Sequence, residues 1–464
     1  MSDYRQFVAR KLDMVQWDGI DADLRDYALF PHQRDLTAWA LRRGKAAIFA
    51  DTGLGKMRMA IAWADVVRNR TGRPVMILCP LAVAQQFVAE GLLMGIRVDH
   101  VREESDVTDG INITNYDRMH KFDMRTFAGV ALDESSIIKS HASKTLSMLM
   151  DAFRATPYKL CCTATPSPND WTELGTHAEF LGVRSRAEML SEFFVHDGGD
   201  TSVWRLKGHA RGVFWRWVAS WGAMIRSPAD LGYDASAYEL PPLTMHQHTV
   251  EIEHNPDHGL FALEAQTLTE RRQARRDSMD ARVKACSDLV NASDEPWIVW
   301  CDLNDEGDML ERAIRGAVQV AGADDNEVKE RRMVGFSSGE HRVLVSKQKI
   351  CGWGMNWQHC ANQAFVGVND SYEGFYQAVR RSWRFGQNRP VNIHVFASNQ
   401  DGAVVANIKR KQEAAQAMAE AMSRETLAAV RESVLGSKKE TNDYAPSRQI
   451  FLPSFLCQNV ESAA

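Results

Sequence analysis

A segment with two glycines and a lysine joins an apolar run to a stretch with helical periodicity. Its residues, Asp51-Thr52-Gly53-Leu54-Gly55-Lys56-Met57, follow the apolar run 46–49. At such a strand-to-helix turn, the unpaired N–H groups of the helix N-terminus suit a phosphate, and Lys56 can reach its terminal oxygens. The usual phosphate-loop pattern is G-x-x-x-x-G-K-[ST]. Ala50 and Met57 depart from this pattern, so a plain glycine turn is the alternative to nucleotide binding.

An acidic pair ends a second apolar run. Asp133-Glu134 directly follows residues 129–132, which have the composition of a buried strand. In phosphate-loop ATPases, a pair at such a strand end holds Mg²⁺ and orients the attacking water. The separation between Lys56 and Asp133 leaves room for the intervening strand and helix units. The alternative is that the pair only caps a helix.

Two arginines in the second half of the chain could bind an anion between them. Arg381 and Arg384 are three positions apart and therefore share one helix face. Their guanidinium groups repel each other unless an anion lies between them, and a triphosphate is such an anion. Lys56 is so distant in sequence that a second domain is expected to carry the arginines. A nucleotide that contacts both would lie in a cleft that closes on binding and opens when the terminal phosphate is lost.

The segments that must position these residues are predicted to be strands and helices that alternate along the chain. This alternation predicts α/β folding with a mainly parallel sheet in each half of the chain. Ligands bind at the carboxyl ends of such strands, where the glycine segment, the acidic pair and Thr163-Ala164-Thr165-Pro166 all fall. The predicted strands lie at 46–49, 75–80, 111–116, 129–132 and 158–162, and then at 297–301, 318–320, 342–346, 364–368 and 391–396.

Two segments outside this alternation bear on the site. Residues 171–245 are rich in tryptophan, a pattern more typical of core packing than of a base-stacking platform, and they end in the linker 239–243. Gln33 precedes a predicted helix, and its amide could read an adenine edge through one donor and one acceptor. A glutamine on a helix surface is the alternative.

Composition excludes several classes of protein. The length of 464 residues favours two domains, and the net charge of −5 carries no global nucleic-acid signature. The eight cysteines form no CxxC pair, which indicates reduced, buried thiols in a cytosolic protein. No apolar run approaches the roughly 18 residues of a membrane span, and no signal peptide is evident, so no membrane partner is expected.

Seven segments, taken in order, resemble the motifs of superfamily-two helicase-like ATPases. Within that superfamily, they look most like the Swi/Snf-type DNA translocases and their bacteriophage or prophage DEAD/DEAH-box relatives. The segment 377–387 is close to the family's motif VI, Q-A-x-x-R-x-x-R-x-G-Q. The others correspond to motifs I at 51–56, Ia at 77–80, Ib at 113–117, II at 133–136, III at 163–166 and V at 352–358.

The resemblance implies two tandem RecA-like domains, each a parallel sheet flanked by helices, with a helical insertion after motif III. It divides the chain into five parts. These are a lead-in at 1–25, the ATP-binding lobe at 26–170, the insertion and linker at 171–245, the second lobe at 246–402, and a C-terminal helix and tail at 403–464.

The resemblance also implies roles for individual residues, with ATP and Mg²⁺ as the cofactors. Lys56 would bind the β- and γ-phosphates, Asp133 would hold Mg²⁺, and Glu134 would polarise the attacking water. Arg381 and Arg384 would be arginine fingers, while Thr163, Ala164 and Thr165 would couple the nucleotide state to the grip on DNA. The full ATP-binding set would be Gln33, Asp51, Thr52, Gly53, Leu54, Gly55, Lys56, Met57, Gly354 and Gln377.

Two departures from the family pattern affect these expectations. Met57 replaces the hydroxyl residue that ligates Mg²⁺, and a thioether is a poor ligand for a hard cation. Thr52 in the same loop is a candidate replacement. Ser135-Ser136 replaces Ala-His in motif II, so the histidine link to the second lobe is missing from the motif.

The expected function is an ATP-driven translocase that moves on DNA, most readily duplex DNA with little sequence preference. The alternatives are a strand-separating helicase and a catalytically weak ATP-binding scaffold subunit that binds DNA. The expected location is the cytoplasm of a bacterium or a phage-infected host. The apolar segment 450–456 in the C-terminal tail is a candidate contact for a protein partner.

Overall fold

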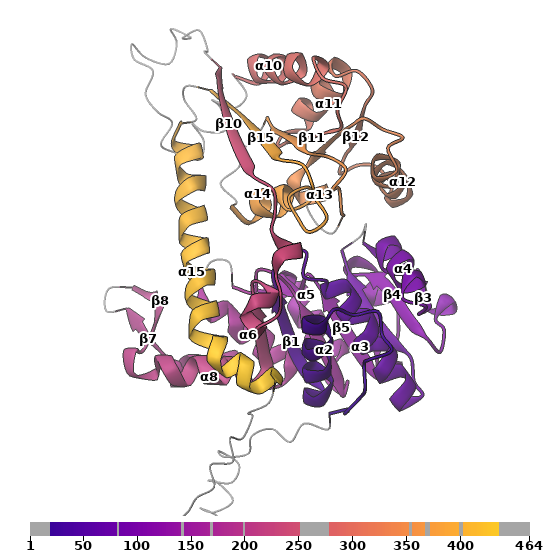
Figure 1. Cartoon of the computed structure of the whole chain (residues 1–464), viewed down its shortest axis with the longest axis vertical. Helices are drawn as coiled ribbons and strands as arrows, with labels where there is room; N and C mark the ends of the chain where they lie inside the picture. Colours follow the sequence, from indigo (N-terminus) through magenta and orange to yellow (C-terminus); the bar gives the residue numbers. More distant parts are fainter. Residues whose placement is uncertain are drawn as a thin grey trace, which may run out of the picture.

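The computed structural model of the chain places two α/β lobes one above the other, and a long helix runs beside both (Figure 1). Each lobe contains one parallel sheet flanked by helices, which confirms the predicted fold of two RecA-like domains. The domain limits themselves stay predictions. The structure describes residues 19–80, 83–140, 143–167, 170–197, 200–250, 278–351, 355–366, 372–398 and 402–435. Gly354, most of the predicted lead-in and the tail segment 450–456 lie outside these residues.

Lobe 1 is built on a seven-stranded sheet of order β3-β4-β2-β5-β6-β1-β9, in which all pairings are parallel. Its central strands are buried on both faces, which explains their continuous apolar runs. The strands are β1 (Lys45–Ala50), β2 (Val75–Cys79), β3 (Val98–His100), β4 (Ile111–Asn115), β5 (Gly129–Asp133), β6 (Tyr158–Cys162) and β9 (Gly222–Ile225).

Helices cover both faces of this sheet. They are α2 (Pro31–Arg43), α3 (Lys56–Thr71), α4 (Ala84–Leu93) and α5 (Lys144–Ala152). Short 3-10 helices complete the connections of the first 250 residues: η1 (Glu104–Asp106), η2 (Tyr116–Lys121), η3 (Met124–Thr126), η4 (Ser135–Ile138), η5 (Trp171–Glu173), η6 (Gly208–Ala210), η7 (Pro228–Leu231) and η8 (Ser236–Tyr238).

The insertion after motif III contains strands as well as the predicted helices. Its helices are α6 (Leu174–Leu181), α7 (Arg186–Phe193) and α8 (Arg211–Trp221), and β7 (Phe194–Asp197) pairs antiparallel with β8 (Asp200–Leu206). Strand β9 returns to the first sheet and pairs with β1. Trp215 and Trp221 are fully buried in the core of lobe 1, as the tryptophan-rich pattern indicated.

Lobe 2 repeats the design with a six-stranded parallel sheet of order β10-β15-β14-β11-β13-β12. Its strands are β10 (Leu243–Val250), β11 (Trp297–Cys301), β12 (Ala317–Val320), β13 (Val343–Lys347), β14 (Asn362–Phe365) and β15 (Val391–Ser398). Its helices are α10 (Met279–Asn291), α11 (Asn304–Ala313), α12 (Asn326–Ser337), α13 (Gln348–Cys351) and α14 (Tyr372–Val379).

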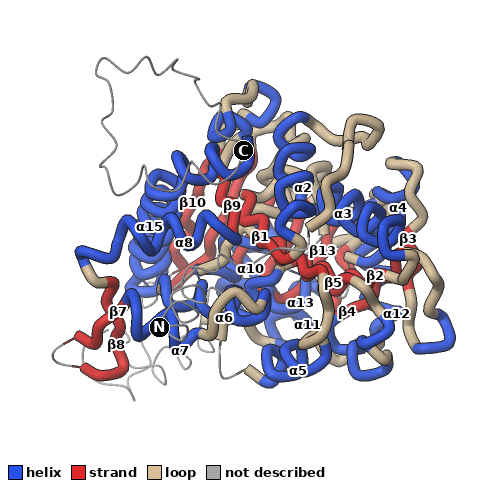
Figure 2. The backbone as a smooth tube through the Cα atoms, turned by 90° about the horizontal axis from the view of Figure 1, so that it is seen from below, coloured by secondary structure: helices blue, strands red, loops and turns tan. Residues whose placement is uncertain are grey.

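Helix α15 (Gly402–Leu435) connects the two lobes. It follows β15 of lobe 2, yet its later turns pack against α2, α8 and β9 of lobe 1, and Figure 2 shows it beside α8. Trp39 Nε1 donates a hydrogen bond of 2.7 Å to Ser433 Oγ, and Arg211 pairs with Glu425 at 3.0 Å. The helix therefore ties the end of lobe 2 to the outer side of lobe 1.

The seven described cysteines are all buried and free of disulfides. Among the described residues, no helix has the length and apolar character needed to cross a bilayer.

Candidate active site

The glycine segment forms a tight loop between β1 and α3. Gly53 and Gly55 have φ angles of 90° and 83°, which lie in the left-handed region that glycine adopts without strain. A Cβ atom on Gly55 would lie 2.1 Å from Gln33 Nε2, and one on Gly53 would lie 2.9 Å from Phe385 Cβ. Both positions therefore require glycine for space as well as for conformation.

The side chain of Gln33, on α2, stabilises this loop. Its Nε2 donates to the carbonyl oxygen of Leu54 at 3.1 Å, and its Oε1 accepts from the backbone N–H of Phe30 at 3.0 Å. The side chain is buried and also lines the cavity described below. In this structure, the amide predicted to read adenine holds the loop in place.

Lys56 is the first residue of α3, and its ammonium group is buried. Nζ donates to the carbonyl oxygens of Ala50 at 2.8 Å and Asp51 at 3.2 Å. Burial lowers the pKa of Lys56, and the negative charges of Glu134, Asp51 and Asp133 oppose that shift.

The acidic pair lies where β5 ends, next to the loop. Burial, reinforced by the charge of Glu134, raises the pKa of Asp133 to about 7 despite the nearby Lys56 and Arg381. Glu134 has a φ of 51°, an uncommon value for a side chain with a Cβ. Its buried Oε2 has no hydrogen-bond partner among the residues that the structure describes. A carboxylate oxygen in this state can accept a hydrogen bond from a ligand or a water.

Arg381 approaches this pair from lobe 2. Its Nη2 lies 3.9 Å from Glu134 Oε1 and donates to Gln377 Oε1. Its Nε donates to the carbonyl oxygen of Gln377, and its Nη1 donates to the carbonyl oxygen of Met355. Gln377 therefore orients the arginine instead of facing the cavity. Gln377 Nε2 also donates to Thr165 Oγ1 at 3.5 Å, so it connects the motif III segment to lobe 2.

Arg384 lies beside Arg381 and donates to Asn356 Oδ1. Burial, together with the charges of Arg381 and Arg380, lowers the pKa of Arg384 to about 9. Its buried Nε has no partner among the described residues. The site therefore concentrates positive charge that a bound anion would offset.

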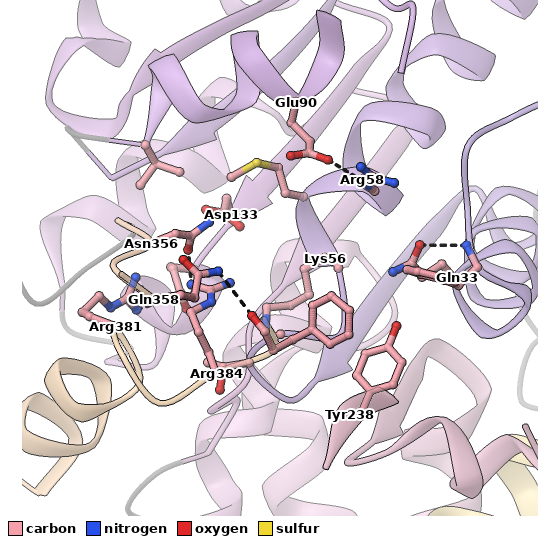
Figure 3. Close-up of a pocket in the computed structure, with 18 residues that line it drawn as sticks. Gln33, Lys56, Arg58, Glu90, Asp133, Tyr238, Asn356, Gln358, Arg381 and Arg384 are labelled. Atoms are coloured by element: carbon pink, nitrogen blue, oxygen red, sulfur yellow. Dashed lines mark hydrogen bonds and ion pairs between the residues drawn. The ribbon is translucent and has the colours of Figure 1, made fainter. Parts of the chain in front are cut away.

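These residues line one cavity of about 370 Å³ between the lobes (Figure 3). That volume lies within the range typical of small-molecule sites. Phe30, Tyr238 and Phe385 form an apolar wall at one side, with the rings of Tyr238 and Phe385 4.7 Å apart. The cavity thus combines charged groups from both lobes with an aromatic surface that suits a nucleotide base.

The structure brings the five residues predicted as catalytic together in the lining of this cavity: Lys56, Asp133, Glu134, Arg381 and Arg384. Of the predicted ATP-binding set, Gln33, Thr52, Gly53, Gly55, Lys56 and Met57 line it. Leu54 is instead buried in the core, and Asp51 and Gln377 are not among the residues that line the cavity. Gly354 lies outside the described residues.

The predicted coupling residues follow β6. Thr163 is fully buried, and its Oγ1 accepts from the backbone N–H of Thr165 at 3.1 Å. Ala164, between them, is partly buried. The contact between Thr165 and Gln377 is the one that reaches lobe 2.

Some residues of the site were not predicted. Arg380 forms an ion pair of 2.8 Å with Asp51 and also donates to Thr52 Oγ1. The hydroxyl of Thr52, which was the candidate replacement for the missing Mg²⁺ ligand, is therefore bound to an arginine. The run of arginines in motif VI was the only sequence signal for Arg380.

A second unpredicted contact concerns motif II. Ser135 Oγ lies 3.1 Å from Nε2 of His177 on α6, and both side chains are buried. Burial lowers the pKa of His177 to about 4, so the imidazole is neutral at pH 7. Motif II lacks its usual histidine, and the contact with His177 lies on the lobe 1 side, so it does not restore the link to lobe 2. No sequence pattern indicated it.

The chain was compared with models of protein families. Residues 32–217 match the SNF2-related domain. This match confirms the resemblance to Snf2-type, superfamily-two helicase-like ATPases that the motifs indicated. Among curated proteins, no match was found.

Two solved structures are similar to this chain. One is the SWI2/SNF2 ATPase core of Sulfolobus solfataricus in complex with dsDNA, with 16% identity, coverage of 90% of this chain and 97% of that one, and a TM-score of 0.39. The other is a fragment assigned as the HsdR subunit of a type I restriction enzyme from Vibrio vulnificus YJ016, with 16% identity and a TM-score of 0.50. That match covers 81% of this chain and 64% of the Vibrio chain, and it supports the fold alone.

Proposed function

We propose that this protein hydrolyses ATP in the cavity between its lobes and uses the resulting lobe movement to translocate on duplex DNA. The observation that carries the proposal is the convergence of Lys56, Asp133 and Glu134 from lobe 1 with Arg381 and Arg384 from lobe 2. Because each lobe contributes part of the site, a movement of the lobes changes the distances between these side chains. The SNF2-related domain supports both the ATPase activity and the DNA partner.

The phosphates of ATP would bind at the N-terminus of α3. The backbone N–H groups there and the ammonium of Lys56 supply positive charge, and the lysine would exchange its carbonyl partners for phosphate oxygens. Arg381 and Arg384 would stabilise the charge of the transferred phosphoryl group, as arginine fingers do. Glu134 Oε2 would accept a hydrogen bond from the attacking water.

A magnesium ion fits this site if it arrives with the nucleotide. The described residues contain no group of three or more His, Cys, Asp or Glu side chains arranged to hold a metal alone. Mg²⁺ usually keeps several waters and binds through one or two carboxylates plus the substrate phosphates, so Asp133 would be its carboxylate ligand. The ion would neutralise charge on the phosphates during transfer.

A second function, an ATP-binding scaffold with weak hydrolysis, is favoured by one residue. Met57 lines the cavity at the position where the family pattern has a hydroxyl ligand for Mg²⁺. Its thioether would leave the ion with one ligand fewer. The buried charges of Lys56 and Asp133 favour the active enzyme, because such charges are costly to keep without a use.

The deciding experiment is steady-state ATP hydrolysis without nucleic acid, with single-stranded DNA and with blunt duplex. We compare the native chain with Glu134→Gln and with Glu432→Gln, a matched control at an exposed position on α15. Stimulation by duplex that is lost only in Glu134→Gln supports the proposal. Stimulation by single strands alone would instead indicate a helicase.

Translocation is then tested by displacement of a third strand from a DNA triplex. The native protein should displace it with ATP but not with a non-hydrolysable analogue. Hydrolysis at the level of Glu134→Gln under every condition, with DNA still bound, would reject the ATPase and leave the scaffold function.

A further inference from the structure

The aspartate of the phosphate-binding loop is held by two side chains of lobe 2. Asp51 Oδ1 accepts from Arg380 Nη2 at 2.8 Å and from the hydroxyl of Tyr376 at 3.0 Å. The Arg380 side chain is 6% exposed and that of Asp51 is 27% exposed, so the ion pair is largely shielded from water. Arg380 Nε also donates to Thr52 Oγ1.

We propose that Arg380 is a positioning residue that latches lobe 2 to the phosphate-binding loop and thereby aims Arg381 and Arg384 into the cavity. The proposal rests on the proposed function, since it concerns the same cavity. The latch consists of Asp51, Thr52, Tyr376 and Arg380. Through the latch, lobe 2 contacts the phosphate-binding loop directly, and not only through a bound nucleotide.

The directions of the three arginine side chains support a positioning role for Arg380 and a role in the cavity for Arg381 and Arg384. Helix α14 ends at Val379, and a tight turn follows in which the N–H of Arg381 donates to the carbonyl oxygen of Ala378 at 3.1 Å. Arg381 and Arg384 leave this turn toward the cavity, as Figure 3 shows, whereas Arg380 is not among the residues that line it. Holding Arg380 therefore fixes the turn that orients the other two.

Each nitrogen of the Arg380 guanidinium has a partner in lobe 1 or in its own turn. Nε and Nη2 donate to lobe 1, and Nη1 donates to the carbonyl oxygen of Trp383 at 3.5 Å. The guanidinium also lies 5.2 Å from the centre of the Trp383 ring and 5.6 Å from that of Tyr376. With these partners, and outside the lining of the cavity, Arg380 is placed to act through its neighbours.

Charge gives the latch a second effect. Three guanidinium groups within five residues repel one another, and Asp51 offsets one of them. Burial raises the pKa of Asp51, but Arg380, the N–H of Thr52 and Lys56 outweigh burial and lower it, so the aspartate stays charged. Without Asp51, Arg380 would be a buried cation without its counter-charge, which is strongly unfavourable.

The latch also reaches the catalytic lysine through the loop. Asp51 Oδ1 accepts from the N–H of Thr52 at 2.6 Å, and the carbonyl oxygen of the same aspartate accepts from Lys56 Nζ at 3.2 Å. Movement of Arg380 should therefore be transmitted to the position of Lys56. The latch links lobe closure to the geometry of both halves of the site.

The first test needs no nucleotide. Small-angle X-ray scattering of the full chain measures the radius of gyration of the native protein, Arg380→Ala, Asp51→Asn and the double variant. Each single variant should expand, and the double variant should expand little further, because both changes remove the same ion pair. Asp51 and Arg380 belong to different lobes, so equal expansion excludes local misfolding of either lobe.

The matched control is Arg389→Ala. This arginine also belongs to lobe 2 and loses an ion pair, with Glu295 at 2.6 Å, but that pair lies within lobe 2 and is half-exposed. Its radius of gyration should equal that of the native protein. An unchanged radius in Arg380→Ala and Asp51→Asn would overturn the latch.

The second test is ATP hydrolysis. Arg380→Ala should lower kcat about tenfold, a loss of ~1.4 kcal/mol of transition-state stabilisation, with a smaller change in KM. Arg380→Lys should restore part of kcat, since it keeps the charge but not the two-sided contacts. A change in KM alone, with native kcat, would overturn the positioning role.

The two proposals can fail separately. Expansion of the single variants in a protein that does not hydrolyse ATP would reject the proposed function and support the latch. Native kcat and native radius in Arg380→Ala, in a protein that hydrolyses ATP, would reject the latch and leave the function standing.

Discussion

Replacing Gly53 with alanine should open the cavity without changing any charge. Gly53 has a φ of 90°, and a Cβ atom there would lie 2.9 Å from Phe385 Cβ and 3.0 Å from the backbone nitrogen of Phe385. Real Cβ atoms essentially never come closer than 3.0 Å to another heavy atom. Rotation of a side chain cannot relieve contact with a backbone atom, so lobe 2 must shift.

The magnitude follows from comparison with Gly72, which has a φ of 65° and no atom within 4 Å of the position that a Cβ atom would take. Alanine at either site introduces left-handed strain of about 1–2 kcal/mol. A less flexible unfolded chain offsets about 0.4–1 kcal/mol of this. Both variants should therefore lose about 1 kcal/mol of stability, and the excess effect of Gly53→Ala reports the contact between the lobes.

The additional effect of Gly53→Ala, compared with Gly72→Ala, should appear as a lower kcat. Arginine fingers contribute about 10³–10⁵ to phosphoryl transfer, so withdrawal of lobe 2 should lower kcat of Gly53→Ala at least about tenfold. Gly72→Ala should keep native kcat. The assay is steady-state ATP hydrolysis at saturating ATP, with urea unfolding of both variants as the measure of strain. Equal kcat in the two variants, at equal stability, would refute the reasoning.

Three further predictions concern single residues of the site. Met57→Thr should raise kcat at limiting Mg²⁺, because a hydroxyl is a harder ligand than a thioether, and superimposable Mg²⁺ titrations would contradict this. The pKa of Asp133 is raised from 3.8 to about 7, so its contribution to stability is full below pH 4 and is lost as the pH rises to 7. Asp133→Asn should therefore flatten the dependence of urea unfolding on pH in that window, measured without nucleotide. The pKa of His177 is lowered from 6.5 to about 4, so its contribution is present above pH 6.5 and is lost as the pH falls toward 4. His177→Gln, which keeps a polar partner for Ser135 but does not titrate, should lose less stability between pH 7 and pH 5 than the native protein does.

Contiguous patterns made the fold and most of the site predictable. The apolar runs that became β1, β2 and β5 are buried on both faces, and a strand of that kind is recognisable within its own few residues. The glycine loop, the acidic pair and the arginine pair are also local patterns. Their meeting at one cavity follows from the parallel sheets, which place successive strand ends at one edge.

Contacts between residues distant in sequence were not predictable in this way. Strand β9 lies in a segment predicted to be helical, and it becomes a strand because the free edge of β1 pairs with it. The neighbour of Ser135, His177, comes from the insertion and carries no pattern of its own. In both cases, the stabilising partner is supplied by the packing of the chain and not by adjacent residues.

The arginines of motif VI show what can be predicted from the sequence alone and what cannot. The residue types alone determined that this chain carries a loop suited to phosphate, an acidic pair and a cationic turn, because each depends on spacing within one short segment. Only the tertiary structure decided that Arg381 and Arg384 reach the cavity from a turn after α14, and not from the helix face expected for them, and that Arg380 binds Asp51. The reason is physical: the direction of each guanidinium depends on the turn after α14 and on the approach of the other lobe, and neither is encoded in the spacing of the arginines.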